Sequence, residues 1–593
     1  MARHHQSVPG KKRAKVENVK ETLLRIWRYL VEQKGMLTLV MLMVLASSSF
    51  ALLGPYLLGV TVDDVIAGSN GSELVTMLLL LVGIFLFQSF TQWLHNFWMI
   101  GIAQDTVYTM RKDLFQHFQQ LPTAFFVKRQ HGELMSRVTN DIENVSKVLN
   151  TTVIQFTTSI LTIVGTIVVM LVLSPLLTLL TLAVVPLMFI GLKWITNRTG
   201  PLFKDQQRHL GEVNGYVEET LSGHNVVKMF SQEERVKREF AKRNEDLRKS
   251  SYWAQTYSGF IPKVMNFLNN ASFAVIVGVG GWLAVEGAVT IGIIVTFTTY
   301  SRQFTRPLND LANQFNVILS AVAGAERVFQ VMDEERETKD EVGAKPVSDI
   351  RGDIEFRNVS FGYETDQPTL RNVSFHAKPG QTVALVGPTG AGKTTVISLL
   401  SRFFDIQDGK IYVDGEDMET MTRASLRKQM AVVLQDAVLF ETTVRENIRY
   451  GRLEATDEDV VRAAKQANAH DFIEKLQDGY DTVLTDGGSG ISQGQRQLLS
   501  IARALLANPS LLILDEATSS IDTITEMKIT DALQTLMEGR TSFVIAHRLN
   551  TIQNADLILV LKEGEIIEQG THHTLLKQGG FYARLVQIQQ QSS

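Results

Sequence analysis

Residues 382–400 read TVALVGPTGAGKTTVISLL: an apolar run, a glycine-rich turn and a second apolar run. The pattern GxxxxGK followed by Ser or Thr, set between a strand and a helix, is typical of a loop that binds nucleotide phosphates. The glycines let backbone N–H groups turn toward an anion, and the start of the following helix adds the positive end of its dipole. This stretch therefore predicts an α/β domain that binds ATP or GTP.

Individual positions in and near this loop have predicted roles. Lys393 is expected to reach the β and γ phosphates, and Thr394 to bind Mg²⁺. Tyr363, in VSFGYE, offers a ring on which adenine can stack; an ordinary strand aromatic is the alternative. The other predicted nucleotide contacts are Gly387, Pro388, Thr389, Gly390, Ala391, Gly392 and Thr395.

A second motif, LLILDEATSSID at residues 511–522, contains an apolar run that ends in two acids. Such a run suits a parallel strand covered on both faces, so Asp515 and Glu516 are expected at the carboxyl end, where open α/β sheets bind ligands. Asp515 is predicted to hold Mg²⁺, and Glu516 to orient or deprotonate the attacking water. An Asp-Glu pair after a strand, considered alone, more often begins a solvated loop. The phosphate loop upstream makes the catalytic role the favoured interpretation.

Two further polar residues follow apolar runs in the same way. His547, in TSFVIAHRLN, is expected to donate to the γ phosphate, although a lone histidine is ordinarily structural. Gln435, in MAVVLQDAVLF, is expected to contact Mg²⁺ or the attacking water. The predicted catalytic residues are therefore Glu516, His547 and Gln435, and the predicted Mg²⁺ ligands are Thr394, Gln435 and Asp515.

The first 320 residues differ in composition, because they contain long apolar runs with few charges. A membrane-spanning helix needs about 20 predominantly apolar residues. Six stretches meet this criterion, and the alternative of a soluble helical core would need six such runs in one domain. The predicted spans are about 36–60, 74–98, 151–173, 176–195, 262–285 and 288–312.

Basic residues set the predicted orientation of these spans. Residues 63–73, after the first span, include three acids and no lysine or arginine, whereas the connections after the second and fourth spans are rich in both. Those connections, both termini and the C-terminal domain are therefore expected in the cytoplasm. Each long connection has helical spacing and turns at a short, partly apolar tip, at 121–134 and 222–230.

Composition limits the partners and the chemistry. The formal net charge is −4, which gives no basic excess for binding nucleic acid. The chain has no cysteine, which excludes disulfides and thiolate chemistry. The predicted organisation is a polar tail (1–20), a membrane domain (21–330), a linker (331–350) and a nucleotide-binding domain (351–593).

With these pieces in order, the chain resembles the ATP-binding cassette (ABC) exporters, specifically bacterial half-transporters that join six spans to one nucleotide-binding domain. The resemblance covers nearly the whole chain from about residue 20 and rests on GPTGAGKTT, LLILDE, the Gln435 and His547 loops, and ISQGQ about 20 residues before Asp515. It implies a multi-domain fold, with an all-α six-helix transmembrane domain and an α/β P-loop domain. It also implies ATP and Mg²⁺ as cofactors.

The resemblance gives the ISQGQ stretch a role in a partner subunit's ATP site. Two subunits would sandwich two ATP molecules, and Asp522 would lie at the same interface. The unpaired N–H groups and the dipole at the start of the helix QRQLLSIARALLA favour an anion there. The residues expected to contact the partner's ATP are Ser492, Gln493, Gly494 and Gln495.

Two departures from the family pattern concern this partner site. Gln493 replaces the usual glycine of Leu-Ser-Gly-Gly-Gln, and the usual Gly-Glu-Arg-Gly loop reads TDGG at 485–488, without its arginine. Lys393, Asp515, Glu516 and His547 are intact. This combination resembles the catalytically complete subunit of a heterodimeric exporter, and a homodimer with a harmless Gln493 is the alternative.

The predicted function is ATP-driven export of small amphipathic drugs or lipids by alternating access, in the cytoplasmic membrane. Export of a peptide or other dedicated cargo, and an ATP-gated channel or sensor, are the alternatives. The tips at 121–134 and 222–230 resemble the coupling helices that contact nucleotide-binding domains. Aromatic residues expected near a cargo cavity, or else in packing or interfacial belts, are Trp93, Phe97, Trp98, Phe297 and Phe304.

Overall fold

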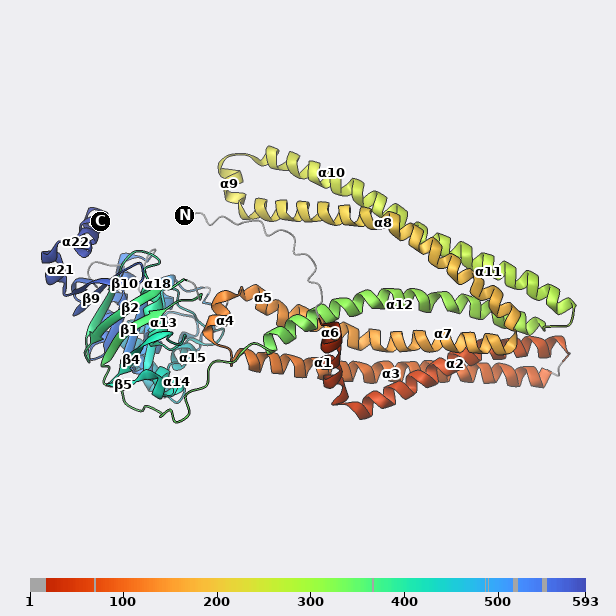
Figure 1. The fold of residues 1–593 in the computed structure, drawn as a ribbon, viewed down its shortest axis with the longest axis horizontal. Coiled ribbons are helices and arrows are strands. Elements are labelled where there is room, and N and C mark those ends of the chain that lie inside the picture. Colours follow the sequence, from red (N-terminus) through yellow and green to blue (C-terminus); the bar gives the residue numbers. More distant parts are fainter. Residues whose placement is uncertain are drawn as a thin grey trace. The chain divides into compact units, whose positions relative to one another are not determined.

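The computed structural model describes residues 18–68, 71–364, 367–485, 487–488, 490–515, 521–546 and 552–592. The chain divides into two compact units. One comprises the chain up to Gln119 together with His131–Glu334, and the other comprises Gln120–Gln130 and the chain from Glu335 onward. Figure 1 shows the first unit as helical and the second as a mixture of strands and helices.

Long helices dominate the first unit. Because Ser174 accepts a hydrogen bond from the Leu177 N–H (3.4 Å) and proline occupies the first helical position, a new helix begins immediately after the preceding one ends. The helices are α1 (Val19–Val31), α2 (Lys34–Ile66), α3 (Gly71–Phe118), α5 (His131–Ser136), α6 (Ile142–Lys147), α7 (Val153–Leu173), α8 (Pro175–Ser222), α9 (His224–Met229), α10 (Glu233–Ser258), α11 (Phe260–Val285) and α12 (Ile291–Met332), with π-helical turns at Arg137–Asp141 and Val148–Thr152.

Four helical stretches among the described residues are long and apolar enough to cross a membrane: Lys34–Ile66, Gly71–Phe118, His131–Leu173 and Glu233–Val285. A shorter apolar stretch covers Pro175–Val184. The predicted span 176–195 lies in α8, and 288–312 lies in α12 apart from its first three residues; each of these helices contains side chains that are not described. The number of six spans therefore stays a prediction.

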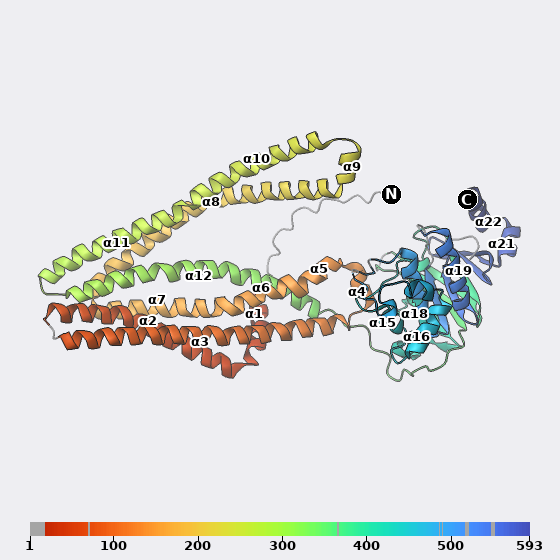
Figure 2. The same cartoon turned by 180° about the vertical axis from the view of Figure 1, so that it is seen from behind.

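The helix α9 leaves an apolar surface uncovered. Figures 1 and 2 agree that α9 and the adjoining ends of α8 and α10 lie apart from the other helices of the first unit. Val226 and Met229 of this helix and the next residue, Phe230, are 59%, 79% and 66% exposed. Apolar side chains exposed together in this way mark a surface that a partner can cover.

The strands of the second unit form two sheets in the described part of the chain. The smaller sheet has the order β2-β1-β4-β5 with antiparallel pairs, and the larger has the order β10-β9-β3-β8-β7-β6. The strands are β1 (Ile354–Phe361), β2 (Leu370–Ala377), β3 (Thr382–Val386), β4 (Asp408–Val413), β5 (Glu416–Asp417), β6 (Met430–Val433), β7 (Leu511–Asp515), β8 (Thr541–Ile545), β9 (Leu557–Lys562) and β10 (Glu565–Gly570).

In the larger sheet, β3 pairs in parallel with β8 and β9, and β7 pairs in parallel with β6 and β8. The carboxyl ends of these strands consequently lie at one edge of the sheet. The helices of the second unit are α4 (Thr123–Lys128), α13 (Lys393–Leu400), α14 (Arg423–Lys428), α15 (Val444–Arg449), α16 (Asp457–Gln466), α17 (His470–Ile473), α18 (Gln493–Ala507), α19 (Thr523–Met537), α21 (His572–Gln578) and α22 (Phe581–Ser592).

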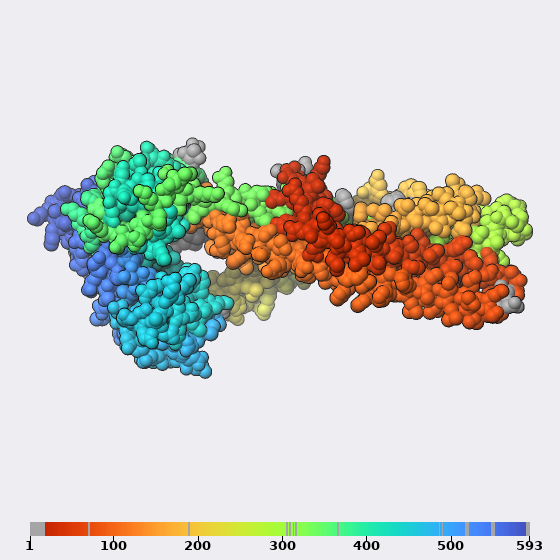
Figure 3. All heavy atoms as spheres, turned by 90° about the horizontal axis from the view of Figure 1, so that it is seen from below, coloured from red at the N-terminus to blue at the C-terminus, as the bar shows by residue number. Residues whose placement is uncertain are grey.

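The described residues of the second unit form two hydrophobic cores. One contains residues of α13 with those of β1, β2 and β4, and the other contains residues of α15, α16, α18 and α19. The faces of the central strands separate them, since Val383 and Leu385 of β3 belong to the first core and Ala384 to the second. In Figure 3 the cyan to light-blue segment that includes α15 and α16 forms a lobe beside the green and teal part that contains β1, β2 and β4.

Candidate functional site

The glycine-rich loop joins β3 to α13, in the strand–loop–helix arrangement predicted for it. Gly392 has φ +103°, and a Cβ atom there would lie 2.5 Å from Cδ2 of Leu370. A Cβ atom on Gly387 would lie 2.2 Å from the carbonyl oxygen of Leu561. These positions therefore require glycine, both for backbone conformation and for space.

Lys393 is the first residue of α13, and its side chain folds back along the loop. Its Nζ donates to the carbonyl oxygens of Gly387 (2.7 Å) and Pro388 (3.0 Å). Burial lowers the pKa of Lys393, and the nearby charge of Asp515 acts in the opposite direction. The lysine charge is thus held against the loop, where it adds to the helix dipole in attracting phosphate.

The predicted Mg²⁺ ligands come from elements that end or begin at the same edge of the larger sheet. Asp515 is the last residue of β7, Gln435 is exposed two residues after β6, and Thr394 is the second residue of α13. A hydroxyl, a carboxylate and an amide oxygen are hard oxygen donors, which suit Mg²⁺. Glu516 and His547, which follow β7 and β8, lie outside the described residues.

Tyr363 lies beside the phosphate loop within a cluster of aromatic rings. Its hydroxyl is 3.2 Å from Oγ1 of Thr395, in α13. Its ring meets those of Phe361 and Phe404 edge-on, with both centroid distances at 5.1 Å. The cluster fixes the ring next to the loop, and stacking with adenine stays a prediction.

The ISQGQ stretch begins α18 through a capping box. The Ser492 Oγ accepts from the Gln495 N–H (3.2 Å), and the Gln495 side chain accepts from the Ser492 N–H (2.8 Å). Gln493 is half-buried at the first helical position, and a Cβ atom on Gly494 would lie 2.4 Å from Thr525 of α19. Gln495 therefore has a structural role that the sequence interpretation missed, although Ser-x-x-Gln before an apolar helix is its recognised signal.

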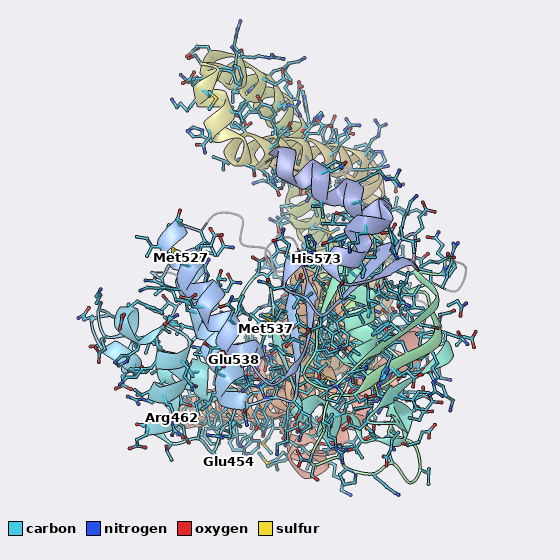
Figure 4. The ribbon with its side chains drawn as sticks, turned by 90° about the vertical axis from the view of Figure 1, so that its left-hand side faces the viewer. Glu454, Arg462, Met527, Met537, Glu538 and His573 are labelled. Carbon is cyan, nitrogen blue, oxygen red and sulfur yellow. The ribbon has the colours of Figure 1, made fainter. Side chains whose placement is uncertain are left out.

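The two predicted phosphate-binding helix ends belong to different cores, because α13 packs in the first core and α18 in the second. Asp522 caps the neighbouring helix α19, on which Figure 4 labels Met527 and Met537. Asp522 accepts a hydrogen bond from the Thr525 N–H at 2.9 Å, and this bond lowers the pKa of its carboxyl group.

Arg503 of α18 contacts the loop after β6, a role that the sequence motifs did not indicate. Its guanidinium donates to the carbonyl oxygens of Asn447 (2.9 Å) and Val438 (3.0 Å), and its Nη2 donates to the Asn447 side chain (3.1 Å). An arginine between apolar residues that are buried, Ala502 and Ala504, was the available signal. The contacts tie the segment that contains Gln435 to the helix that begins at Ser492.

The first unit contains a cavity of about 860 Å³ lined mainly by polar side chains of α2, α3, α7 and α12. Trp93, Phe97, Trp98 and Phe297 are not among its described lining residues, and the side chain of Phe304 is not described. Phe297 is fully buried in an apolar core, whereas Trp93 and Phe97 are exposed and stack with a centroid distance of 5.7 Å. These positions agree with packing and interfacial roles.

Comparison with known proteins identifies the family to which the chain belongs. The model of the ABC transporter transmembrane region matches residues 37–308, and the ABC transporter model matches residues 370–519. The chain belongs to the ABC transporters and is an exporter half-transporter that joins a membrane domain to an ATP-hydrolysing domain. Such exporters work as dimers in a membrane.

Individual relatives cover most of the chain. YfiC, an ABC transporter ATP-binding protein of Bacillus subtilis, is 61% identical over 98% of this chain and 96% of its own length. The fatty acid ABC transporter ATP-binding/permease protein of Mycobacterium tuberculosis is 44% identical over 82% of this chain and 76% of its own length. The ATP-dependent lipid A-core flippase of Syntrophus aciditrophicus is 37% identical over 90% of this chain and 89% of its own length.

A solved structure of a bacterial Atm1-family ABC exporter with ATP bound is also similar. Its TM-score is 0.73 at 30% identity, and the match covers 94% of this chain and 98% of that one. The predicted fold class, a helical membrane domain followed by an α/β P-loop domain, is confirmed, as is the resemblance to ABC exporters. The domain bounds and the roles of individual site residues stay predictions.

Proposed function

We propose that the protein is one half of a dimeric, ATP-driven exporter that moves amphipathic lipids or drugs out of the cell across the cytoplasmic membrane. Both termini and the nucleotide-binding domain lie on the cytoplasmic side. The observation that carries the proposal is the phosphate loop between β3 and α13 in the same chain as long apolar helices. Two of the relatives above are named for lipid cargo, which favours a lipid class.

ATP is expected to bind at the carboxyl edge of the larger sheet, with Lys393 on its β and γ phosphates. Thr394, Gln435 and Asp515 supply oxygen ligands for Mg²⁺, which when bound neutralises phosphate charge. Glu516 orients or deprotonates the attacking water, and His547 donates a hydrogen bond to the γ phosphate.

A second subunit completes each nucleotide site in this proposal. The start of α18, with Ser492, contacts the ATP of the partner, and Asp522 lies at the same interface. This assignment is supported by the separate cores of α13 and α18. The exposed apolar residues of α9 offer a surface for the nucleotide-binding domain of the partner. Closure of the two domains on ATP turns the membrane cavity outward, and hydrolysis resets it.

Sequence features favour a heterodimer. Gln493 extends from the first residue of α18, where a glycine would leave room for the phosphate of the partner's ATP. Residues 485–488 lack the arginine usual in the family pattern. The partner is therefore expected to hold a weaker ATP site, while the phosphate loop of this chain and the signature of the partner form the strong one.

Inside-out vesicles test the proposal directly. Vesicles that carry this chain and its partner should accumulate a fluorescent lipid analogue against its gradient when ATP is supplied, and should stop when ATP is replaced by a non-hydrolysable analogue. An ATP-gated channel would only let the probe equilibrate. A dedicated peptide exporter would accumulate a peptide probe and not the lipid analogue.

A further inference from the structure

The wall of the membrane-unit cavity is unexpectedly polar for a cargo that is mainly hydrocarbon. Of its 23 described lining residues, eighteen are polar or charged, and the apolar ones include Phe85 and Phe273. Polar side chains within membrane segments are costly unless they face water or a polar ligand. The volume, about 860 Å³, suits a ligand of drug or lipid-headgroup size.

Four buried polar atoms on this wall have no hydrogen-bond partner within the described residues. They are Oγ of Ser48, Nδ1 of His95, Oδ1 of Asn150 and Oγ1 of Thr158. Ser48 is 4% exposed and His95 is 3% exposed, so bulk solvent has little access to them. Each of these atoms exposes less than 1 Å², so a molecule in the cavity does not reach them in this conformation, and they show only that polar groups continue behind the cavity surface.

The cavity wall has more positive than negative side chains among its described residues. Arg302, Arg306 and Asp310 follow one another at four-residue intervals on α12, and all three line the cavity. Within the described part of the chain neither arginine has an ion pair, and the Arg302 guanidinium lies 5.0 Å from the centroid of the Phe273 ring. Two guanidinium groups with one carboxylate leave a positive excess, and guanidinium binds phosphate and carboxylate through paired N–H donors.

We infer that this cavity takes an organic anion whose phosphate or carboxylate group binds Arg302 and Arg306, and whose hydroxyl or amide groups bond to polar side chains of the wall such as Gln88 and Gln92. The inference rests on the proposed function, because it assigns the cavity to the cargo. A cationic amphiphile meets two positive groups there and is disfavoured. The anion can be a lipid headgroup or a soluble molecule of the same chemistry.

Two measurements on the full chain with its partner separate the inference from the proposed function. Equilibrium binding to the purified protein uses fluorescent phosphatidylglycerol, the matching phosphatidylcholine, ethidium and radiolabelled glycerol 3-phosphate. ATP-driven uptake of the same four probes into inside-out vesicles follows. We expect phosphatidylglycerol to bind at least about tenfold more tightly than phosphatidylcholine. Each lipid has one phosphate, but the choline group of phosphatidylcholine brings a positive charge close to the two arginines. Binding of glycerol 3-phosphate alone would identify a soluble anion as the ligand.

Variants test whether the preference for the anionic lipid arises from the two arginines of the cavity. The double variant R302Q/R306Q should raise the Kd for phosphatidylglycerol about tenfold relative to ethidium in the same preparation, and R302K/R306K should retain most of the preference. Arg235→Gln removes an exposed positive charge on α10 and should leave both Kd values unchanged. The ratio of two probes serves as an internal control for folding.

Each outcome decides one of the two claims. Equal or stronger binding of ethidium, or a preference for anions that persists in R302Q/R306Q, would overturn the anion site and leave the exporter intact. Anion binding that depends on the arginines without ATP-driven uptake of any probe would support the site and contradict export.

Discussion

Lys393, Asp515 at the end of β7 and the next residue, Glu516, are expected to have different roles at the nucleotide site. The lysine holds charge against the loop and is expected to bind phosphate, whereas Glu516 is expected to act on water. Binding and hydrolysis are therefore expected to depend on different side chains, so that substitutions can separate them.

Glu516→Gln should leave ATP binding intact and slow hydrolysis about 10²- to 10⁴-fold, because an amide cannot take the proton of the attacking water. Nucleotide retention and phosphate release measure the two effects. Glu538→Gln, at the exposed end of α19 labelled in Figure 4, is the matched control and should hydrolyse ATP normally. Unchanged turnover in Glu516→Gln would remove its assigned role.

Gly392→Ala should destabilise the nucleotide-binding domain and weaken ATP binding. The added Cβ atom meets Leu370 at 2.5 Å in a backbone conformation with φ +103°, and such strain costs about 1–3 kcal/mol. Gly390→Ala shares a positive φ of +83° but meets no described atom within 4 Å, so it should lose less stability. Thermal unfolding compares the two variants, and an equal loss would contradict the steric argument.

The contact between α18 and the loop after β6 is a link between elements. Arg503 carries that link through its hydrogen bonds to Val438 and Asn447, and burial lowers the pKa of its guanidinium. The loop that holds Gln435 and the helix that starts at Ser492 should therefore move together.

Arg503→Met should keep ATP binding but reduce hydrolysis, and should destabilise the domain by about 2 kcal/mol through the lost charged hydrogen bonds. Thermal unfolding and ATPase assays on the same sample measure both effects. The control is Arg462→Met on α16, whose exposed ion pair with Asp459 contributes little, at most about 1 kcal/mol. Figure 4 labels Arg462. Equal effects of the two substitutions would contradict the proposed link.

The exposed helix α9 allows a test of the proposed contact between the membrane domain and the nucleotide-binding domain of the partner. Met229→Glu, in the uncovered face of α9, should abolish transport while the chain still binds ATP, because a charge in an apolar interface is costly to bury. Val31→Glu on α1, another exposed apolar position, is the control. ATP-driven uptake in vesicles is the measurement, and normal transport by Met229→Glu would show that no partner covers this surface.

For the whole molecule, the central question is which subunit completes the ATP site. Expressed alone, the chain should hydrolyse ATP at less than about a tenth of the rate of the heterodimer, since removing one contact to a transition-state phosphate typically costs 10²–10³ in rate. Steady-state ATPase in lipid, with and without candidate partner chains, measures this. Full activity from a stable self-dimer would favour the homodimer instead.

Much of the second unit was predictable because its signals are local. The loop at 387–392 must follow a strand and precede a helix, and residues 511–515 must form a covered strand. Glycine conformation, helix dipoles and runs of apolar residues act over a few neighbours, so the sequence pattern contains them. The long apolar runs predicted a membrane domain for the same reason.

The amino-acid sequence thus determined the class of protein, its order of domains and the positions of its nucleotide motifs. Only the tertiary structure decided that Ser48, His95, Asn150 and Arg302 share one cavity, and that Arg503 holds the loop after β6. The cavity residues are separated by up to about 250 positions, and each taken alone is an ordinary polar residue in a helix. Packing between distant helices brings them together, and no local pattern encodes that packing.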